Sequence, residues 1–156
     1  MNVWYVNSIL GTFRLEEEND AICGLTLCPD GVPELEPLPR KVVETPLLQE
    51  AEEQLNEYFA GVRRKFDLPL AAKGTAFQQA VWAQLCKIPY GEVRTYGQLA
   101  AALGKPKASR AVGSACHRNP LCIVVPCHRV IGADGSLTGY AEGLDIKEYL
   151  LELERF

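Results

Sequence analysis

Three short stretches near the N-terminus alternate apolar or β-branched residues with polar ones. They cover residues 3–6, 12–15 and 22–27, and turn-forming residues separate them at Gly11 and at Asn19-Asp20. An alternation of period two, interrupted by such residues, predicts strands joined by tight turns. Residues 29–39 contain four prolines and are predicted to form a loop.

The apolar positions then change to a helical period. Thr45 and Pro46 stand at the start of this stretch and Gly61 at its end, which predicts a helix with a threonine cap and a proline in its first turn. Residues 67–70 are predicted to be a linker. We therefore divide the chain into a small N-terminal α/β domain, residues 1–70, whose role the sequence does not disclose, and a second domain, residues 71–156.

The second domain is predicted to be mostly helical. Thr75 with Gln78, and Thr95 with Gln98, have the spacing of capping boxes. Each pair precedes apolar residues at helical spacing, so one helix should begin after Thr75 and another after Thr95.

A further helix is expected from Pro106 to about Ala115, after a short connection through Gly104. Two short helices joined by such a turn predict a helix-turn-helix, whose second helix would lie in a DNA groove. Most of its side chains are small and Arg110 is a long cation, which suits a groove; small residues would equally allow close helix packing. The expected fold class is α+β, with a winged-helix-like second domain.

An apolar run, residues 123–125, leads into Pro126, Cys127, His128 and Arg129. Because proline cannot donate to a β ladder, we expect a buried strand that ends at Pro126, followed by a turn that carries the thiol. A thiolate is the nucleophilic form of cysteine, and a neighbouring imidazole or guanidinium lowers a thiol's pKa. The alternative is a buried structural cysteine beside a solvated histidine.

Charge is distributed unevenly along the chain. Residues 1–60 carry 3 basic and 12 acidic side chains, whereas residues 61–156 carry 13 basic and 8 acidic ones. Between Lys73 and Arg129 the only acid is Glu92. A basic segment that contains the thiol is typical of a site for a polyanion, although an ordinary solvated face could have the same composition.

No apolar run is long enough to cross a bilayer, and the N-terminus lacks a signal-peptide pattern. We expect a cytoplasmic protein without membrane association, in which the six cysteines stay reduced. Zinc is an alternative for Cys116, His117, Cys127 and His128, but no CxxC or HxxxH pair is present, so no metal is predicted. No phosphate-cradling fingerprint occurs, and no cofactor is predicted.

Glu148 lies three residues after Asp145, at the start of a helix expected over residues 145–154. It could be the acidic partner of a capping box whose cap is Asp145. It could instead orient His128 and complete a Cys–His–Glu relay. The sequence leaves both interpretations open.

Taken together, these residues resemble the O6-alkylguanine-DNA alkyltransferases, also called methylated-DNA–protein-cysteine methyltransferases. Residues 126–130 match the family's active-site signature, and further motifs fall in the family's order over residues 73–154. They are residues 77–82, 88–93, 95–100, 108–113, 119–120, 139–140 and 147–150. Residues 1–70 are similar only in length and coarse pattern.

The resemblance implies direct reversal of DNA damage. Cys127 would accept, once and irreversibly, the alkyl group of an O6-alkylguanine flipped out of duplex DNA, with O4-alkylthymine left open as a second substrate. His128 would take the thiol proton through a water, Glu148 would hold the imidazole, and Asn119 would brace the turn. The implied contacts are Tyr96, Val130, Tyr140 and Ala141 to the base, and Tyr96, Arg110, Lys105 and Lys107 to the DNA. His117 and Arg118 depart from the family, many members of which have small or uncharged residues there, and we interpret them as phosphate contacts. The implied partner is duplex DNA carrying the lesion, bound by a monomer without cofactor.

Two other functions remain open at this point. A lesion-binding protein without transfer activity would carry tryptophan in place of the reactive cysteine, so Cys127 argues against it. A Cys–His hydrolase would need an oxyanion site and would turn over, and it would not require a helix-turn-helix beside the thiol.

Overall fold

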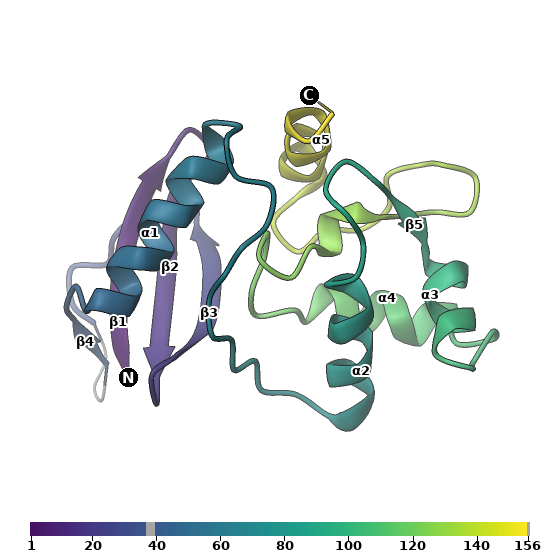
Figure 1. Cartoon of the computed structure of the whole chain (residues 1–156), viewed down its shortest axis with the longest axis horizontal. Coiled ribbons are helices and arrows are strands. Elements are labelled where there is room, and N and C mark those ends of the chain that lie inside the picture. Colours follow the sequence, from purple (N-terminus) through teal and green to yellow (C-terminus); the bar gives the residue numbers. More distant parts are fainter. Residues whose placement is uncertain (37–39, 156) are drawn as a thin grey trace. The chain divides into compact units, whose positions relative to one another are not determined.

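The computed structural model describes residues 1–36 and 40–155, which belong to two compact units, residues 1–72 and 73–156 (Figure 1). The first unit is a four-stranded sheet of order β3-β2-β1-β4, with one helix packed against it. Its elements are β1 Asn2–Ser8, β2 Gly11–Glu18, β3 Ala21–Cys28, β4 Lys41–Val42 and α1 Pro46–Phe59. The three predicted strands and the helix are confirmed, whereas the short parallel strand β4 was not predicted.

Turns and caps in this unit follow the predicted chemistry. Asn19 and Asp20, between β2 and β3, both have positive φ, which these residues tolerate better than most. The Thr45 hydroxyl accepts from the backbone N–H of Leu48 at 3.1 Å and donates to Glu17 at 3.0 Å. The cap therefore ties the start of α1 to the sheet beneath it.

The segment predicted as a linker is partly attached to the first unit. Ile22 of β3 donates to the Pro69 carbonyl at 2.8 Å and accepts from the Ala71 N–H at 2.9 Å. These bonds place Leu70 beside β3 as a parallel bridge. Of the loop predicted over residues 29–39, residues 37–39 lie outside the described part of the chain.

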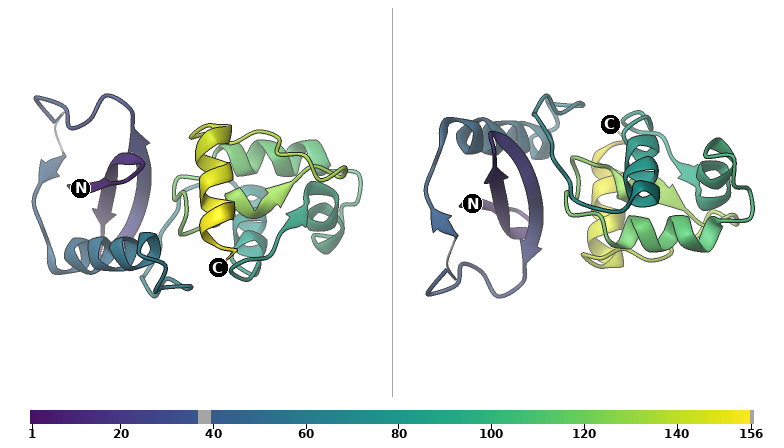
Figure 2. Two further views of the ribbon diagram at one scale, coloured as in Figure 1. Left: turned by 90° about the horizontal axis from the view of Figure 1, so that it is seen from above. Right: turned by 90° about the horizontal axis from the view of Figure 1, so that it is seen from below.

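The second unit is mostly helical, as predicted, and Figure 2 shows it from two further directions. Both capping boxes are confirmed, Thr75 with Gln78 and Thr95 with Gln98. Two short parallel strands lie beside the helices. The elements are α2 Ala76–Leu85, β5 Arg94–Thr95, α3 Tyr96–Ala102, α4 Ser109–His117, the 3₁₀ turn η1 Cys127–Arg129, β6 Val130–Ile131 and α5 Leu144–Leu153.

The helix-turn-helix pair consists of α3 and α4, but α4 begins later than predicted. Pro106 lies in a turn in which the Ala108 N–H donates to the Lys105 carbonyl at 2.9 Å, and the helix starts only at Ser109. Proline is favoured in such turns because its fixed φ suits their second position. Both lysines of this turn, Lys105 and Lys107, are exposed just before α4, with Lys105 Nζ 5.3 Å from the centroid of the Phe77 ring.

The apolar run before the thiol is buried, but the prediction of a strand there was wrong. The chain turns at residues 122–125, where the Val124 N–H donates to Cys122 and the Val125 N–H to Leu121. Ile123 has φ 71°, an unusual value for a β-branched residue. A short apolar run fits a strand or a buried turn equally well, so its pattern could not decide between them. In the described residues no helix has both the length and the apolarity needed to span a membrane.

Candidate active site

Asn119 holds the turn that presents the thiol. Its amide nitrogen donates to the Val125 carbonyl at 2.8 Å and lies 3.3 Å from Cys127 Sγ, while its Oδ1 accepts from the Leu121 N–H at 2.9 Å. Cys127 begins η1 and is 6% exposed. A single buried amide thus fixes the backbone on both sides of the turn and the sulfur itself.

The side chains of His128 and Arg129 both reach a buried carboxylate, Glu154. The His128 Nε2 lies 2.7 Å from Glu154 Oε2, and the Arg129 guanidinium donates to both Glu154 oxygens at 2.8 and 3.0 Å. Arg129 also donates to the Ile88 carbonyl at 2.7 Å. Since Nε2 faces an acceptor, the neutral imidazole carries its proton there, and Nδ1 is left as an acceptor. Nδ1 is buried and has no hydrogen-bond partner among the described residues.

The orienting acid is Glu154, and both interpretations of Glu148 were wrong. Glu148 is exposed, and the start of α5 has Gly143 at its cap position with no side-chain cap from Asp145. Glu154 follows directly after the last residue of α5 and is 3% exposed. Six residues along a helix correspond to a rotation of about 600°, so the two acids lie on different faces. The signal that could have distinguished Glu154 from Glu148 was the position of each acid relative to the buried face of α5.

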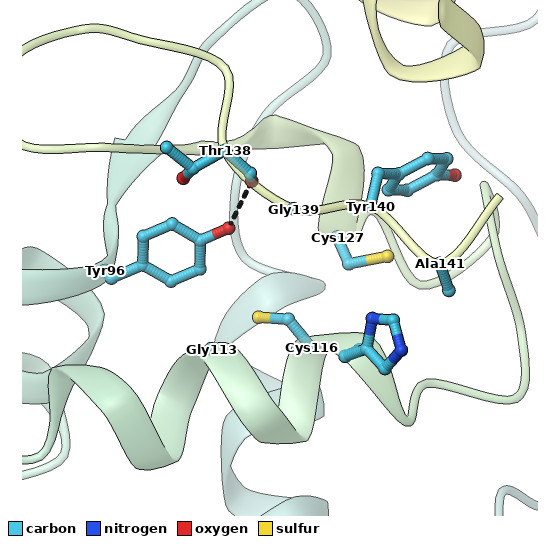
Figure 3. Close-up of a pocket in the computed structure, with 9 residues that line it drawn as sticks. Tyr96, Gly113, Cys116, Cys127, Thr138, Gly139, Tyr140 and Ala141 are labelled. Carbon is cyan, nitrogen blue, oxygen red and sulfur yellow. Dashed lines mark hydrogen bonds between the residues drawn. The ribbon is translucent and has the colours of Figure 1, made fainter. Parts of the chain in front are cut away.

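A cavity of about 240 Å³ opens beside the thiol (Figure 3). Helix α3 contributes Tyr96, and α4 contributes its last turn, while the loop between β6 and α5 covers the far side. The Tyr96 hydroxyl donates to the Thr138 carbonyl at 2.9 Å. Four consecutive residues of this loop, residues 138–141, line the cavity. The lining residues are Tyr96, Gly113, Cys116, His117, Cys127, Thr138, Gly139, Tyr140 and Ala141.

Burial dominates the protonation of this site. It raises the pKa of Cys127 to about 11, against which the Asn119 hydrogen bond and the charge of Lys147 act. Burial also lowers the pKa of His128 below its usual 6.5, although the hydrogen bond and charge of Glu154 oppose this. At neutral pH the site therefore contains a thiol and a neutral imidazole that can accept a proton.

The sequence of this chain matches a known protein family over nearly its whole length. Residues 76–156 match the DNA-binding domain of 6-O-methylguanine DNA methyltransferase, and residues 3–72 match the ribonuclease-like domain of the same proteins. The chain belongs to this family. It is 52% identical over 149 residues to the constitutive methylated-DNA–protein-cysteine methyltransferase of Bacillus subtilis, covering 94% of this chain and 90% of that protein.

Other members of the family extend the comparison. The methylated-DNA–protein-cysteine methyltransferase of Methanosarcina barkeri is 62% identical over 106 residues, 68% of this chain and 67% of that protein. The crystal structure of Mycobacterium tuberculosis OGT in complex with DNA superimposes with a TM-score of 0.90 at 42% identity, covering 99% of this chain and 93% of that chain. The α+β fold predicted from the sequence is therefore confirmed, because a family member superimposes on nearly the whole chain.

The other residues predicted to contact the base or the DNA differ in how far they are buried. Tyr140 and Ala141 line the cavity, whereas Val130 is fully buried beside it. Lys105, Lys107 and Arg110 are exposed in the turn before α4 and in its first turn. His117, predicted to contact phosphate, lines the cavity.

Lys147 was not recognised as a site residue from the sequence. It is fully buried, and its Nζ donates to the carbonyls of Val130, Thr138 and Gly139. A lysine on the inward face of an otherwise amphipathic final helix was the available signal, because charged residues are rarely buried without a partner.

Removing the carboxylate of Glu154 should destabilise the protein far more than removing that of Glu148. Glu154→Ala leaves His128 and Arg129 buried without their partner, which we expect to cost about 3–5 kcal/mol, whereas Glu148→Ala at an exposed position should cost less than about 0.5 kcal/mol. Urea unfolding of both variants measures the difference. Equal losses of unfolding free energy in the two variants would show that the contacts of Glu154 with His128 and Arg129 do not support the fold.

Proposed function

We propose that this protein repairs DNA by direct reversal, accepting the alkyl group of O6-alkylguanine in duplex DNA on Cys127 in a single turnover. The observation that carries the proposal is the thiol at a pocket between a helix-turn-helix and a loop, beside a buried His–Glu pair. Relatives named methylated-DNA–protein-cysteine methyltransferases support it. The activity is that of a cysteine S-methyltransferase, and it requires no cofactor because the DNA supplies the group transferred.

The proton of Cys127 is the first obstacle, because burial favours the thiol. We assign His128 Nδ1 as its acceptor, through one bridging water, since that atom is buried and has no hydrogen-bond partner in the described part of the chain. Glu154 then stabilises the imidazolium at Nε2. Asn119 and Lys147 favour the thiolate.

The transfer itself is a displacement at carbon. Cys127 Sγ attacks the alkyl carbon, the bond from that carbon to O6 breaks, and its electron pair goes to the base. Tyr96 donates a hydrogen bond to the departing base, and the backbone at Val130, Tyr140 and Ala141 frames it. The thiol proton replaces the lost alkyl group on guanine, so the products are an S-alkylcysteine and an unmodified base.

The lesion lies inside a duplex and must be flipped out before it reaches the cavity. Arg110, exposed on the first turn of α4, would fill the gap left by the base, while Lys105 and Lys107 neutralise phosphates. These assignments place DNA binding and alkyl acceptance in residues 71–156. All reacting groups come from one chain, so we infer a monomer, located inside the cell with its DNA substrate.

The decisive experiment is intact-mass analysis after mixing with duplex DNA containing O6-methylguanine. We expect the mass of one methyl group in place of one hydrogen, on the Cys127 peptide, and no more than one equivalent per chain. Cys127→Ser should gain none and Cys116→Ser should react like the parent. Binding without a mass change would indicate a lesion-binding protein, and steady turnover would indicate a hydrolase.

The pH dependence should report His128. Because its pKa is lowered, the imidazole stays neutral down to pH 6.5, so the transfer rate should fall only below that value. Glu154→Gln removes the charge that raises the pKa of His128, so the fall should move to lower pH. At pH values above this fall, where the transfer rate no longer depends on pH, the rate of Glu154→Gln should be at least about tenfold lower than that of the parent, because general base catalysis is weakened. Glu148→Gln is the matched control, and a shift in that variant instead would contradict the assignment.

Arg110→Ala should slow transfer from duplex DNA much more than transfer from free O6-methylguanine, since only the duplex needs its gap filled. The salt dependence of DNA binding should change by no more than about one phosphate contact. Lys107→Ala, as a comparison, should weaken binding to all sequences alike. If Arg110→Ala slowed both substrates equally, Arg110 would act on the chemistry or the fold.

A further inference from the structure

Lys147 has an unusual position for a charged side chain. It is 0% exposed on α5, and within residues 1–36 and 40–155 no carboxylate pairs with it. Burial lowers its pKa. Three backbone carbonyls, those of Val130, Thr138 and Gly139, compensate for the water it has lost. An apolar residue at this position would avoid the cost of removing a charge from water. The hydrogen bonds of Lys147 to the three carbonyls are therefore the feature to explain.

Lys147 shares one of these carbonyls with Tyr96. The Thr138 oxygen accepts from the Tyr96 hydroxyl at 2.9 Å and from Lys147 Nζ at 3.1 Å. A carbonyl oxygen has two lone pairs, so both bonds can exist together. The Tyr96 hydroxyl has only one proton, however, and must leave Thr138 before it can donate to a base.

We propose that Lys147 is a positioning residue that keeps the Thr138 carbonyl hydrogen-bonded while Tyr96 transfers its own hydrogen bond to the flipped base. This inference rests on the function proposed above, because that function assigns Tyr96 to the base. A base in the cavity displaces water from the wall that Thr138 lines. Without Lys147, that carbonyl would then lack a donor, and base entry should be weakened about tenfold.

Lys147 also fixes the direction of the loop amides. The carbonyls of Thr138 and Gly139 both point toward it, and in a planar trans peptide the N–H points the opposite way. The N–H groups of Gly139 and Tyr140 therefore point away from Lys147, and both residues line the cavity. One ammonium group thus orients the donors of the loop and releases the donor of Tyr96.

A double-mutant cycle tests the exchange. Transfer from a methylated duplex is measured under single-turnover conditions for the parent, Lys147→Met, Tyr96→Phe and the double variant. Each rate is divided by the rate of Cys127 alkylation by iodoacetamide, which reports thiol reactivity with no base in the cavity. This division removes the direct effect of the Lys147 charge on the thiol. Affinity for unmodified duplex controls for DNA docking.

The expected result is non-additive. Lys147→Met should lower the normalised rate about tenfold when Tyr96 is present and less than about threefold when combined with Tyr96→Phe, where no hydrogen bond has to be exchanged. Lys147→Arg, which keeps several donors, should recover most of the rate. Affinity for unmodified duplex should stay within about twofold.

Equal losses in both backgrounds, or an unchanged normalised rate, would overturn the inference. If Lys147→Met fails to fold in a thermal melt, Lys147→Leu replaces it throughout the cycle, since leucine likewise removes the donor from the Thr138 carbonyl. Failure of the proposed function gives a different result, because the parent protein itself would then gain no alkyl group on Cys127.

Discussion

The buried carboxylate of Glu154 connects three parts of the second unit. It holds His128 and Arg129 of η1, and Arg129 continues to the Ile88 carbonyl just after α2. Two cationic or potentially cationic groups and one anion are thereby removed from water in a geometry that satisfies most of their donors. Such a cluster is costly to bury and more costly to break, because each remaining member would be left uncompensated. The same contact fixes the tautomer of His128 and leaves Nδ1 as its free acceptor.

The sequence predicted those features that depend on neighbouring residues. The caps at Thr75 and Thr95 were found because a glutamine three positions after each threonine completes a capping box, and the cap at Thr45 because a proline follows it. Cys127 and His128 were found because they are adjacent. Glu154 was missed because its choice over Glu148 depends on which face of α5 turns inward, and that follows from packing.

Two other differences have the same origin. The run before Cys127 was taken for a strand, yet the Asn119 side chain holds residues 121–125 in a turn, donating to the Leu121 and Val125 carbonyls and accepting from the Leu121 N–H. Lys147 was not recognised as a site residue, since its three acceptors come from β6 and from the loop between β6 and α5. In both cases the partners are backbone groups, which have no signature in the sequence.

The cavity is built largely from the elements that also form the helix-turn-helix. Tyr96 is the first residue of α3, and Cys116 and His117 belong to the last turn of α4, which begins near the exposed cations. Any shift of these helices would therefore reshape the cavity. The duplex contacts and the base contacts proposed above would therefore be linked through α3 and α4.

Cys116 illustrates how the surroundings make two identical functional groups chemically different. Its sulfur lines the same cavity as Cys127, but burial and the nearby Cys127 raise its pKa to about 12. The Asn119 amide donates to Cys127 Sγ at 3.3 Å and opposes the effect of burial on the pKa of that thiol. One amide hydrogen bond, to Cys127 and not to Cys116 among the causes that act on their pKa values, thus makes the cavity regioselective between two thiols that share it.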